Sequence, residues 1–130
     1  MKTGLVLEGG GMRGAYTCGV LDAFLDHDIE VDGLIGVSAG ICHGCSYVSK
    51  QRGRAFRVMS DYLRDPRYMS MRSLIQTGDL FNAEFVYHTL PEILDRYDFQ
   101  TFNRSHTRLY AVCSNLESGE AEYIRLIHME

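Results

Sequence analysis

The stretch VDGLIGVSAG, Val31–Gly40, decides the fold of this chain. Val31–Val37 is a short apolar run broken by glycines, which is typical of a buried strand, and the residues from Ala39 to about Val48 predict a helix rich in small side chains. Ser38 stands between them, inside the pattern Gly-x-Ser-x-Gly. In a strand-to-helix context this pattern predicts a nucleophile elbow, a sharp turn that lifts the serine hydroxyl above the sheet.

The neighbours of Ser38 fit such an elbow. Gly36 and Gly40 remove side chains that would clash in so sharp a reversal of the backbone, while Val37 and Ala39 complete the turn. An alternative interpretation is that Ser38 only caps the helix that begins at Ala39, as serines often do. The elbow pattern by itself leaves both interpretations open.

Upstream lies a second motif, LEGGGMRGAY, at Leu7–Tyr16. Thr3–Glu8 is predicted to form a short buried strand, and the residues from Gly14 to about His27 a helix. The order strand, helix, strand, helix implies a right-handed crossover and a parallel strand pair. We therefore expect an α/β domain with functional loops at the carboxyl ends of its strands.

The glycine run Gly9–Gly11 suits an anion at a helix N-terminus, either a nucleotide phosphate or the oxygen of a reacting carbonyl. A dinucleotide site requires an acidic residue at the end of the second strand, where this chain has Ser38. Glu30 comes before that strand, and no Gly-Lys-Ser/Thr of a Walker loop is present. These observations favour an oxyanion hole beside Ser38 over a nucleotide-binding module.

The combination of GGGMRG followed by GVSAG resembles the patatin-like phospholipase family, in particular its bacterial lipid acyl hydrolases. VDGLIGVSAG looks like that family's second strand and elbow, and DPRYMS, LIQTGDLF and AVCSNLESGEA look like its bacterial branch. The resemblance implies a three-layer α/β/α fold with a mainly parallel sheet. It also implies hydrolysis of phospholipid or another fatty-acyl ester, of the phospholipase A or lysophospholipase type, without metal or organic cofactor.

The same resemblance assigns roles to residues of both motifs. It makes Ser38 the catalytic nucleophile and the glycine loop the oxyanion hole, formed by Gly9, Gly10, Gly11, Met12, Arg13 and Gly14. Family members pair the serine with an Asp from an Asp-Gly-Gly or Asp-Gly-Ala motif. The one Asp-Gly of this chain, Asp32-Gly33, is predicted at the opposite end of the strand that leads to Ser38, roughly 20 Å away at about 3.3 Å per residue.

We therefore expect the catalytic Asp beyond Glu130, and residues 1–130 to be the N-terminal part of a patatin-like acyl hydrolase domain. Histidines could replace this base in a triad hydrolase. His43 follows Ser38 on the same predicted helix and should point away from the hydroxyl, and His128 is the alternative late in the chain. The simpler interpretation makes all the histidines ordinary surface or core residues, and the alternative function is then a non-catalytic domain that binds lipid or acyl groups.

Composition and charge limit the partners of the protein. A net charge of −4 argues against nucleic acid, and the short apolar stretch before Glu8 predicts neither signal peptide nor membrane span, so we expect a cytoplasmic protein. The segment Lys50–Arg72 holds seven of the 13 basic residues and predicts either peripheral contact with anionic membranes or a solvated face paired with acids. The cysteines are expected to be reduced, and the C-x-x-C of Cys42 and Cys45 falls in a predicted helix, which disfavours zinc.

The second half of the chain is expected to be less regular at first. Asp65-Pro66 and Gly78-Asp79 predict helix ends, and Thr89-Leu90-Pro91-Glu92 fits a capping box that begins a new short helix. Residues 109–113 and 121–127 predict a strand hairpin. An unpaired sheet edge after this hairpin would favour self-association.

Overall fold

A computed structural model describes all residues, 1–130, and divides them into two compact units. The first unit comprises residues 1–55 and 98–130, and the second comprises residues 56–97. Each unit is described by itself below. No helix in either unit has the length and apolar composition needed to cross a bilayer.

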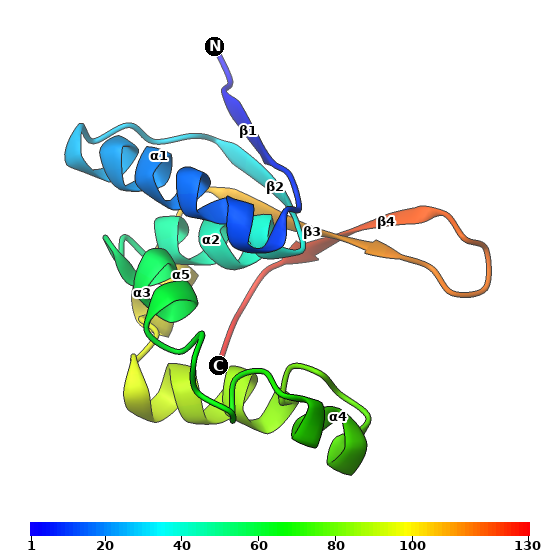
Figure 1. Ribbon diagram of the computed structural model, residues 1–130. Coiled ribbons are helices and arrows are strands. Elements are labelled where there is room, and N and C mark those ends of the chain that lie inside the picture. Colours follow the sequence, from blue (N-terminus) through cyan, green and yellow to red (C-terminus); the bar gives the residue numbers. More distant parts are fainter. The chain divides into compact units, whose positions relative to one another are not determined.

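The first unit contains a four-stranded sheet in the order β1-β2-β3-β4 (Figure 1). The strands β1 (Gly4–Leu7), β2 (Gly33–Val37) and β3 (Arg108–Ser114) run parallel, and β4 (Ala121–Leu126) is antiparallel to β3. The expected α/β class with a mainly parallel sheet is confirmed. Both β1 and β2 end at the same edge of the sheet, which places the two sequence motifs next to each other.

Helix α1 (Ala15–Asp26) connects β1 to β2, and helix α2 (Ala39–Val48) follows β2, with the bounds predicted for it. Helix α2 contacts β1, β2 and β3, and α1 packs on α2. The core of the unit lies between α2 and the sheet, where Leu7, Leu34 and Leu109 are buried. The opposite face of the sheet is open within this unit, where Val6 is 73% exposed.

Close helix–sheet packing depends on a glycine of α2. A Cβ added at Gly44 would lie 2.8 Å from Cδ2 of Leu34, a side chain with no exposed surface. Helix α5 (Phe99–Arg104) contacts α2 as well. No helix was predicted at the position of α5, although Asp98 caps this helix by accepting a hydrogen bond from the N–H of Thr101 at 2.8 Å.

In the second unit, α4 (Met71–Thr77) ends at Gly78 in the left-handed conformation, as the predicted break requires. Helix α3 (Arg54–Ser60) begins in the first unit and ends before Asp65-Pro66. The prediction of a helix that begins at Thr89 is wrong. A wide helix, η2 (Phe85–Leu94), runs through this position with Pro91 inside it.

The start of that helical segment explains the error. The Asn82 side chain accepts a hydrogen bond from the N–H of Phe85 at 2.9 Å, so the chain is already capped there and Thr89 lies within a helix. Proline has no N–H to donate, and the wider turns of η2 tolerate it. Phe85 is buried in this unit, where the guanidinium of Arg67 lies 4.8 Å from the centre of its ring.

Candidate functional site

Ser38 occupies the sharp turn between β2 and α2. Its backbone has φ 52° and ψ −124°, a conformation that L-residues other than glycine rarely adopt. The side chain makes no capping hydrogen bond to α2, and the residue is exposed. The interpretation of Ser38 as a simple helix cap is therefore wrong.

The glycines on each side of Ser38 are required by close backbone contacts. A Cβ at Gly36 would lie 2.6 Å from Cα of Ile41, and a Cβ at Gly40 would lie 2.4 Å from the carbonyl oxygen of Leu7. Backbone atoms cannot move aside as a flexible side chain can. Gly40 thus presses the first turn of α2 against the end of β1, where the glycine loop begins.

The glycine loop lies directly beside Ser38. A Cβ at Gly9 would be 3.2 Å from Cβ of Ser38 and 3.4 Å from the carbonyl oxygen of Val37. Gly11 has φ 52°, a left-handed conformation that favours glycine, and opens the 3-10 turn η1 (Gly11–Gly14). The structure therefore brings the loop and the elbow together at one sheet edge.

The remaining residues of the loop shape its outer and inner sides. The N–H of Arg13 donates to the carbonyl oxygen of Gly10 at 3.1 Å, which closes the turn. The Arg13 side chain folds back over the loop, with Nε 3.8 Å from where a Gly10 Cβ would be. Met12 is half exposed, whereas Gly14 is buried against the ring of His43.

The sequence-predicted acid and the late histidine lie elsewhere. Asp32 precedes β2 and accepts a hydrogen bond from the N–H of Thr3 at 2.7 Å, at the amino-terminal edge of the sheet. His128 is exposed and follows β4, whose end pairs with the beginning of β3 at that same edge. Its neighbour Met129 is bonded to Asn103 of α5. Neither residue is near Ser38.

The five histidines differ in burial. His27, His88, His106 and His128 are exposed, while His43 is 5% exposed and its Nε2 has no hydrogen-bond partner. Burial lowers the pKa of His43, so its ring favours the neutral form. Sequence reasoning placed His43 on the correct helix but missed its contact with Gly14, because no periodic pattern signals a contact between two loop-and-helix segments.

The cysteines of the first unit lie on helices or strands and not on a metal-binding loop. Cys42 and Cys45 are in α2, as predicted. Burial raises the pKa of the Cys18 thiol to about 11, and the nearby Asp22 carboxylate acts in the same direction. Cys18 therefore stays protonated, which makes it a packing group and not a nucleophile.

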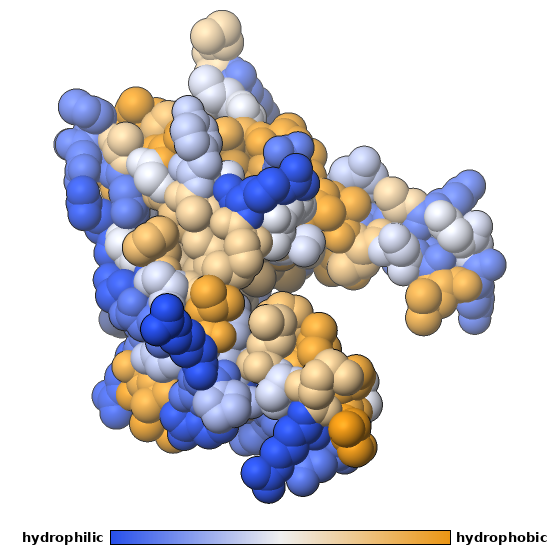
Figure 2. All heavy atoms as spheres, viewed as in Figure 1, coloured by the Kyte–Doolittle hydropathy of each residue, from blue (hydrophilic) through white to orange (hydrophobic).

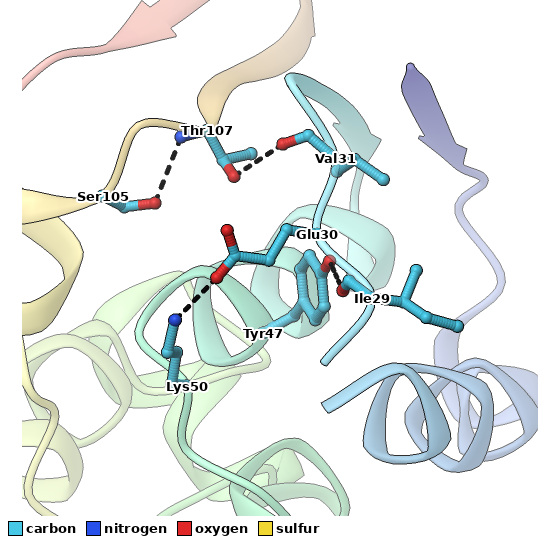
Figure 3. Close-up of polar contacts among 7 residues, drawn as sticks. All are labelled: Ile29, Glu30, Val31, Tyr47, Lys50, Ser105 and Thr107. Carbon is cyan, nitrogen blue, oxygen red and sulfur yellow. Dashed lines mark hydrogen bonds and ion pairs between the residues drawn. The ribbon is translucent and has the colours of Figure 1, made fainter. Parts of the chain in front are cut away.

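A groove of about 620 Å³ lies at the amino-terminal edge of the sheet. There the Tyr47 hydroxyl donates to the carbonyl oxygen of Ile29 at 2.6 Å, and the Thr107 hydroxyl donates to that of Val31 at 2.8 Å (Figure 3). Glu30 and Lys50 point toward each other and form an ion pair of 2.6 Å. Glu30 thus lies before β2, at the edge opposite the glycine loop, and not at the end of the strand where a dinucleotide site requires an acid.

Two comparisons with known proteins indicate what this chain is similar to. The family model described as patatin-like phospholipase matches residues 5–124. The chain is also 30% identical over 86 residues to the uncharacterized protein YjjU of Escherichia coli (strain K12), a match that covers 65% of this chain and 24% of YjjU. The matched region is thus about a quarter of the length of that relative.

Proposed function

Because this chain belongs to the patatin-like phospholipase family, we propose that it is the N-terminal part of a serine lipid acyl hydrolase domain. Ser38 is the nucleophile, and the loop Gly9–Gly14 stabilises the oxyanion. The observation that carries this proposal is the contact between the two motifs: the strained, uncapped Ser38 lies beside Gly9 at the carboxyl ends of adjacent parallel strands. The substrate class is a phospholipid or another fatty-acyl ester.

The geometry supports a two-step acyl transfer. The Ser38 oxygen attacks the ester carbonyl carbon while a base takes the hydroxyl proton, and the negative carbonyl oxygen accepts hydrogen bonds from loop N–H groups. Collapse of this intermediate breaks the ester bond and passes the proton to the departing alcohol. Water then attacks the acyl-serine and releases the fatty acid. Arg13, folded over Gly10, adds positive charge at the rim of the oxyanion site.

We propose that the base is an aspartate from a part of the protein outside residues 1–130. Asp32, the Asp of the single Asp-Gly pair, is held by Thr3 at the other edge of the sheet. A serine hydroxyl without a base is a weak nucleophile near neutral pH. Residues 1–130 alone should therefore hydrolyse esters poorly, with a residual rate from carbonyl polarisation.

The test compares residues 1–130 with a version extended by the following hundred or so residues, using p-nitrophenyl esters of fatty acids. We expect turnover by the extended form to fall by at least about 10³-fold on Ser38→Ala. Ser118→Ala, in the exposed turn between β3 and β4, is the matched control and should leave turnover unchanged. Equal turnover by the short form would contradict the external base. Lipid binding by the extended form without Ser38-dependent turnover would instead indicate a non-catalytic lipid-binding domain.

Peripheral contact with anionic membranes is a finer proposal for the second unit. Apolar side chains gather over α4, where Met71 is 64% and Ile75 is 81% exposed (Figure 2). Arg64 and Arg72 are exposed in the same unit, whereas Arg67 is paired with Asp65 at 2.7 Å. In the first unit Arg54 is 7% exposed, so it belongs to the interior rather than to a membrane-facing surface.

Vesicles containing anionic lipid test this contact. Charge reversal at Arg64 and Arg72 should weaken binding at low ionic strength, and the difference should shrink at high salt. The matched control is Arg67→Gln, which removes a cation that is already paired. Unchanged binding of the double variant would leave a solvated surface as the role of these arginines.

A further inference from the structure

Ser38 and helix α2 contact the end of β1 and the oxyanion loop at three successive points. Ser38, just before the helix, lies beside Gly9; Gly40 meets the carbonyl oxygen of Leu7; and His43 meets Gly14. The first contact is made by the nucleophile and the second by backbone atoms. The third is made by a side chain, the imidazole of His43, which lies beneath the end of the loop.

The contact between His43 and Gly14 is specific to this pair. A Cβ at Gly14 would lie 2.3 Å from Nε2, 3.0 Å from Cδ2 and 3.5 Å from Cε1 of His43, and these are the three heavy atoms nearest to it. Gly14 has φ −58° and ψ −11°, which any residue can adopt. The imidazole ring, and not the backbone conformation, therefore excludes a side chain at position 14.

The ring nitrogen that faces Gly14 is buried without a partner. Nε2 of His43 makes no hydrogen bond, and the residue is 5% exposed. Most buried polar atoms in proteins are paired, because an unpaired one is destabilising. His43 thus places the edge of a buried imidazole ring against the last glycine of the loop that holds the proposed oxyanion site.

We infer that His43 is a positioning residue for the oxyanion site, with its imidazole packed under Gly14 as a rigid support that holds the Gly9–Gly14 loop against Ser38. The inference rests on the proposed function for its catalytic consequence. Its structural consequence is independent of catalysis. Removing the ring leaves an empty space under Gly14, and the loop N–H groups lose their fixed position relative to Ser38.

A first experiment measures amide hydrogen exchange of the peptide that covers residues 7–16, in residues 1–130. His43→Ala should speed exchange of the loop amides at least about tenfold, while His43→Leu, which keeps a buried side chain of similar size, should preserve their protection. Val48→Ala removes buried volume at the other end of the same helix and should leave loop exchange unchanged. If His43→Ala does not fold, we use His43→Asn, whose side chain is shorter than that of histidine, in its place.

A second experiment tests the pairing with Gly14. Gly14→Ala alone should speed loop exchange, because the new Cβ collides with the ring. The same substitution in the His43→Ala background should be much less harmful, since the space under position 14 is then empty. Additive effects of the two substitutions, or loop exchange that is unchanged by His43→Ala, would overturn the inference.

In the extended protein, His43→Ala should lower kcat at least about tenfold with KM changed less than about twofold, because the loop acts on the transition state and not on acyl-chain binding. His43→Leu should restore kcat, and Val48→Ala should not change it. Equal losses of kcat in Val48→Ala would reduce His43 to a structural role. If Ser38→Ala retains full turnover, the proposed function fails, and the exchange experiments still decide whether His43 supports the loop.

Discussion

The two edges of the same sheet differ in backbone strain and in hydrogen bonding. At the carboxyl edge, Ser38 has a strained backbone and an uncapped hydroxyl, and Gly40 is squeezed against backbone atoms. At the amino edge, polar groups are paired, as Tyr47 is with Ile29 and Thr107 with Val31. The strained backbone and the uncapped hydroxyl thus lie at the carboxyl edge, where we propose catalysis. The side-chain hydrogen bonds that stabilise the fold lie at the amino edge.

Positive φ angles occur at both edges, but they have different causes. Asp28 and Lys50, with φ 52° and 56°, lie just past the ends of α1 and α2. The N–H that follows each of them bonds back into its helix, from Ile29 to Phe24 at 2.9 Å and from Gln51 to Ser46 at 2.9 Å. These are ordinary helix ends. Ser38 has no such role, since it precedes its helix and has ψ −124°.

The sharpest test of the contrast exchanges a glycine for alanine at each edge. Gly40→Ala places a Cβ 2.4 Å from the Leu7 carbonyl oxygen and 2.7 Å from that of Glu8, so it should destabilise the fold by about 3 kcal/mol or more. Gly33→Ala at the amino edge meets its nearest atom, the Arg108 carbonyl oxygen, at an ordinary 3.7 Å and should cost less than about 1 kcal/mol. Urea unfolding measures both. Equal losses would show that the crowding at Gly40 is relieved by small movements.

Removing one side-chain hydrogen bond of the amino edge should have an intermediate effect on the free energy of unfolding. Tyr47→Phe deletes the hydroxyl that donates to Ile29 at 2.6 Å and should lower the free energy of unfolding by about 1 kcal/mol. Because this hydrogen bond is far from Ser38, kcat of the extended protein should not change. A fall in kcat at unchanged stability would mean that the two edges are coupled.

The pH dependence of stability should identify His43. Its pKa is lowered from 6.5 by burial, with no charged group contributing, so the unfolded chain binds the proton more readily. The stability that His43 contributes is present above about pH 6.5 and is lost as the pH falls through the lowered folded-state pKa. Urea unfolding of the wild type and of His43→Leu between pH 7.5 and 5 should therefore diverge, with the wild type losing more.

Exposed His88 acts in the opposite direction but is common to both proteins. Its hydrogen bond to Glu92 raises its pKa, so its contribution is present below 6.5 and is lost as the pH rises through the raised value. The contribution of His88 therefore cancels when the free energy of unfolding of His43→Leu is subtracted from that of the wild type at each pH. Parallel pH profiles of the two proteins would contradict the burial of His43 as a neutral ring.

The smallest effect is expected for the surface ion pair of the amino edge. Glu30 and Lys50 are 70% and 62% exposed, and solvent screens their attraction. Lys50→Met should change the free energy of unfolding by at most about 0.5 kcal/mol, and less at high salt. A loss above about 1 kcal/mol in urea unfolding would show that this ion pair stabilises the fold as much as the hydrogen bond of Tyr47 does.

The sequence predicted the parts of the fold that depend on local pattern. The strand before Ser38 and helix α2 from Ala39 to Val48 follow from periodicity and from the elbow motif. The start of η2 was misplaced because Asn82 caps the chain well before the Thr89 motif, and several adjacent motifs can compete for one helix start.

The sequence predicted that the glycine loop and Ser38 lie next to each other, but it did not predict every contact at this edge. The glycine loop and Ser38 are recognisable as motifs, and their adjacency follows from parallel strands. The pairing of His43 with Gly14 could not be predicted, because it depends on how α2 lies against η1. A glycine in a motif does not reveal whether it serves a conformation, a ligand or, as at Gly14, a neighbouring ring.

We propose above that Ser38, in its strained turn at the carboxyl edge, is a reactive nucleophile. A fluorophosphonate, which bonds covalently to activated serine hydroxyls, tests it in the extended protein by intact mass and peptide mapping. We expect a single adduct on Ser38, absent in Ser38→Ala and formed at least about tenfold more slowly in His43→Ala. An adduct on another serine, or no adduct on Ser38 in a protein that hydrolyses esters, would contradict it.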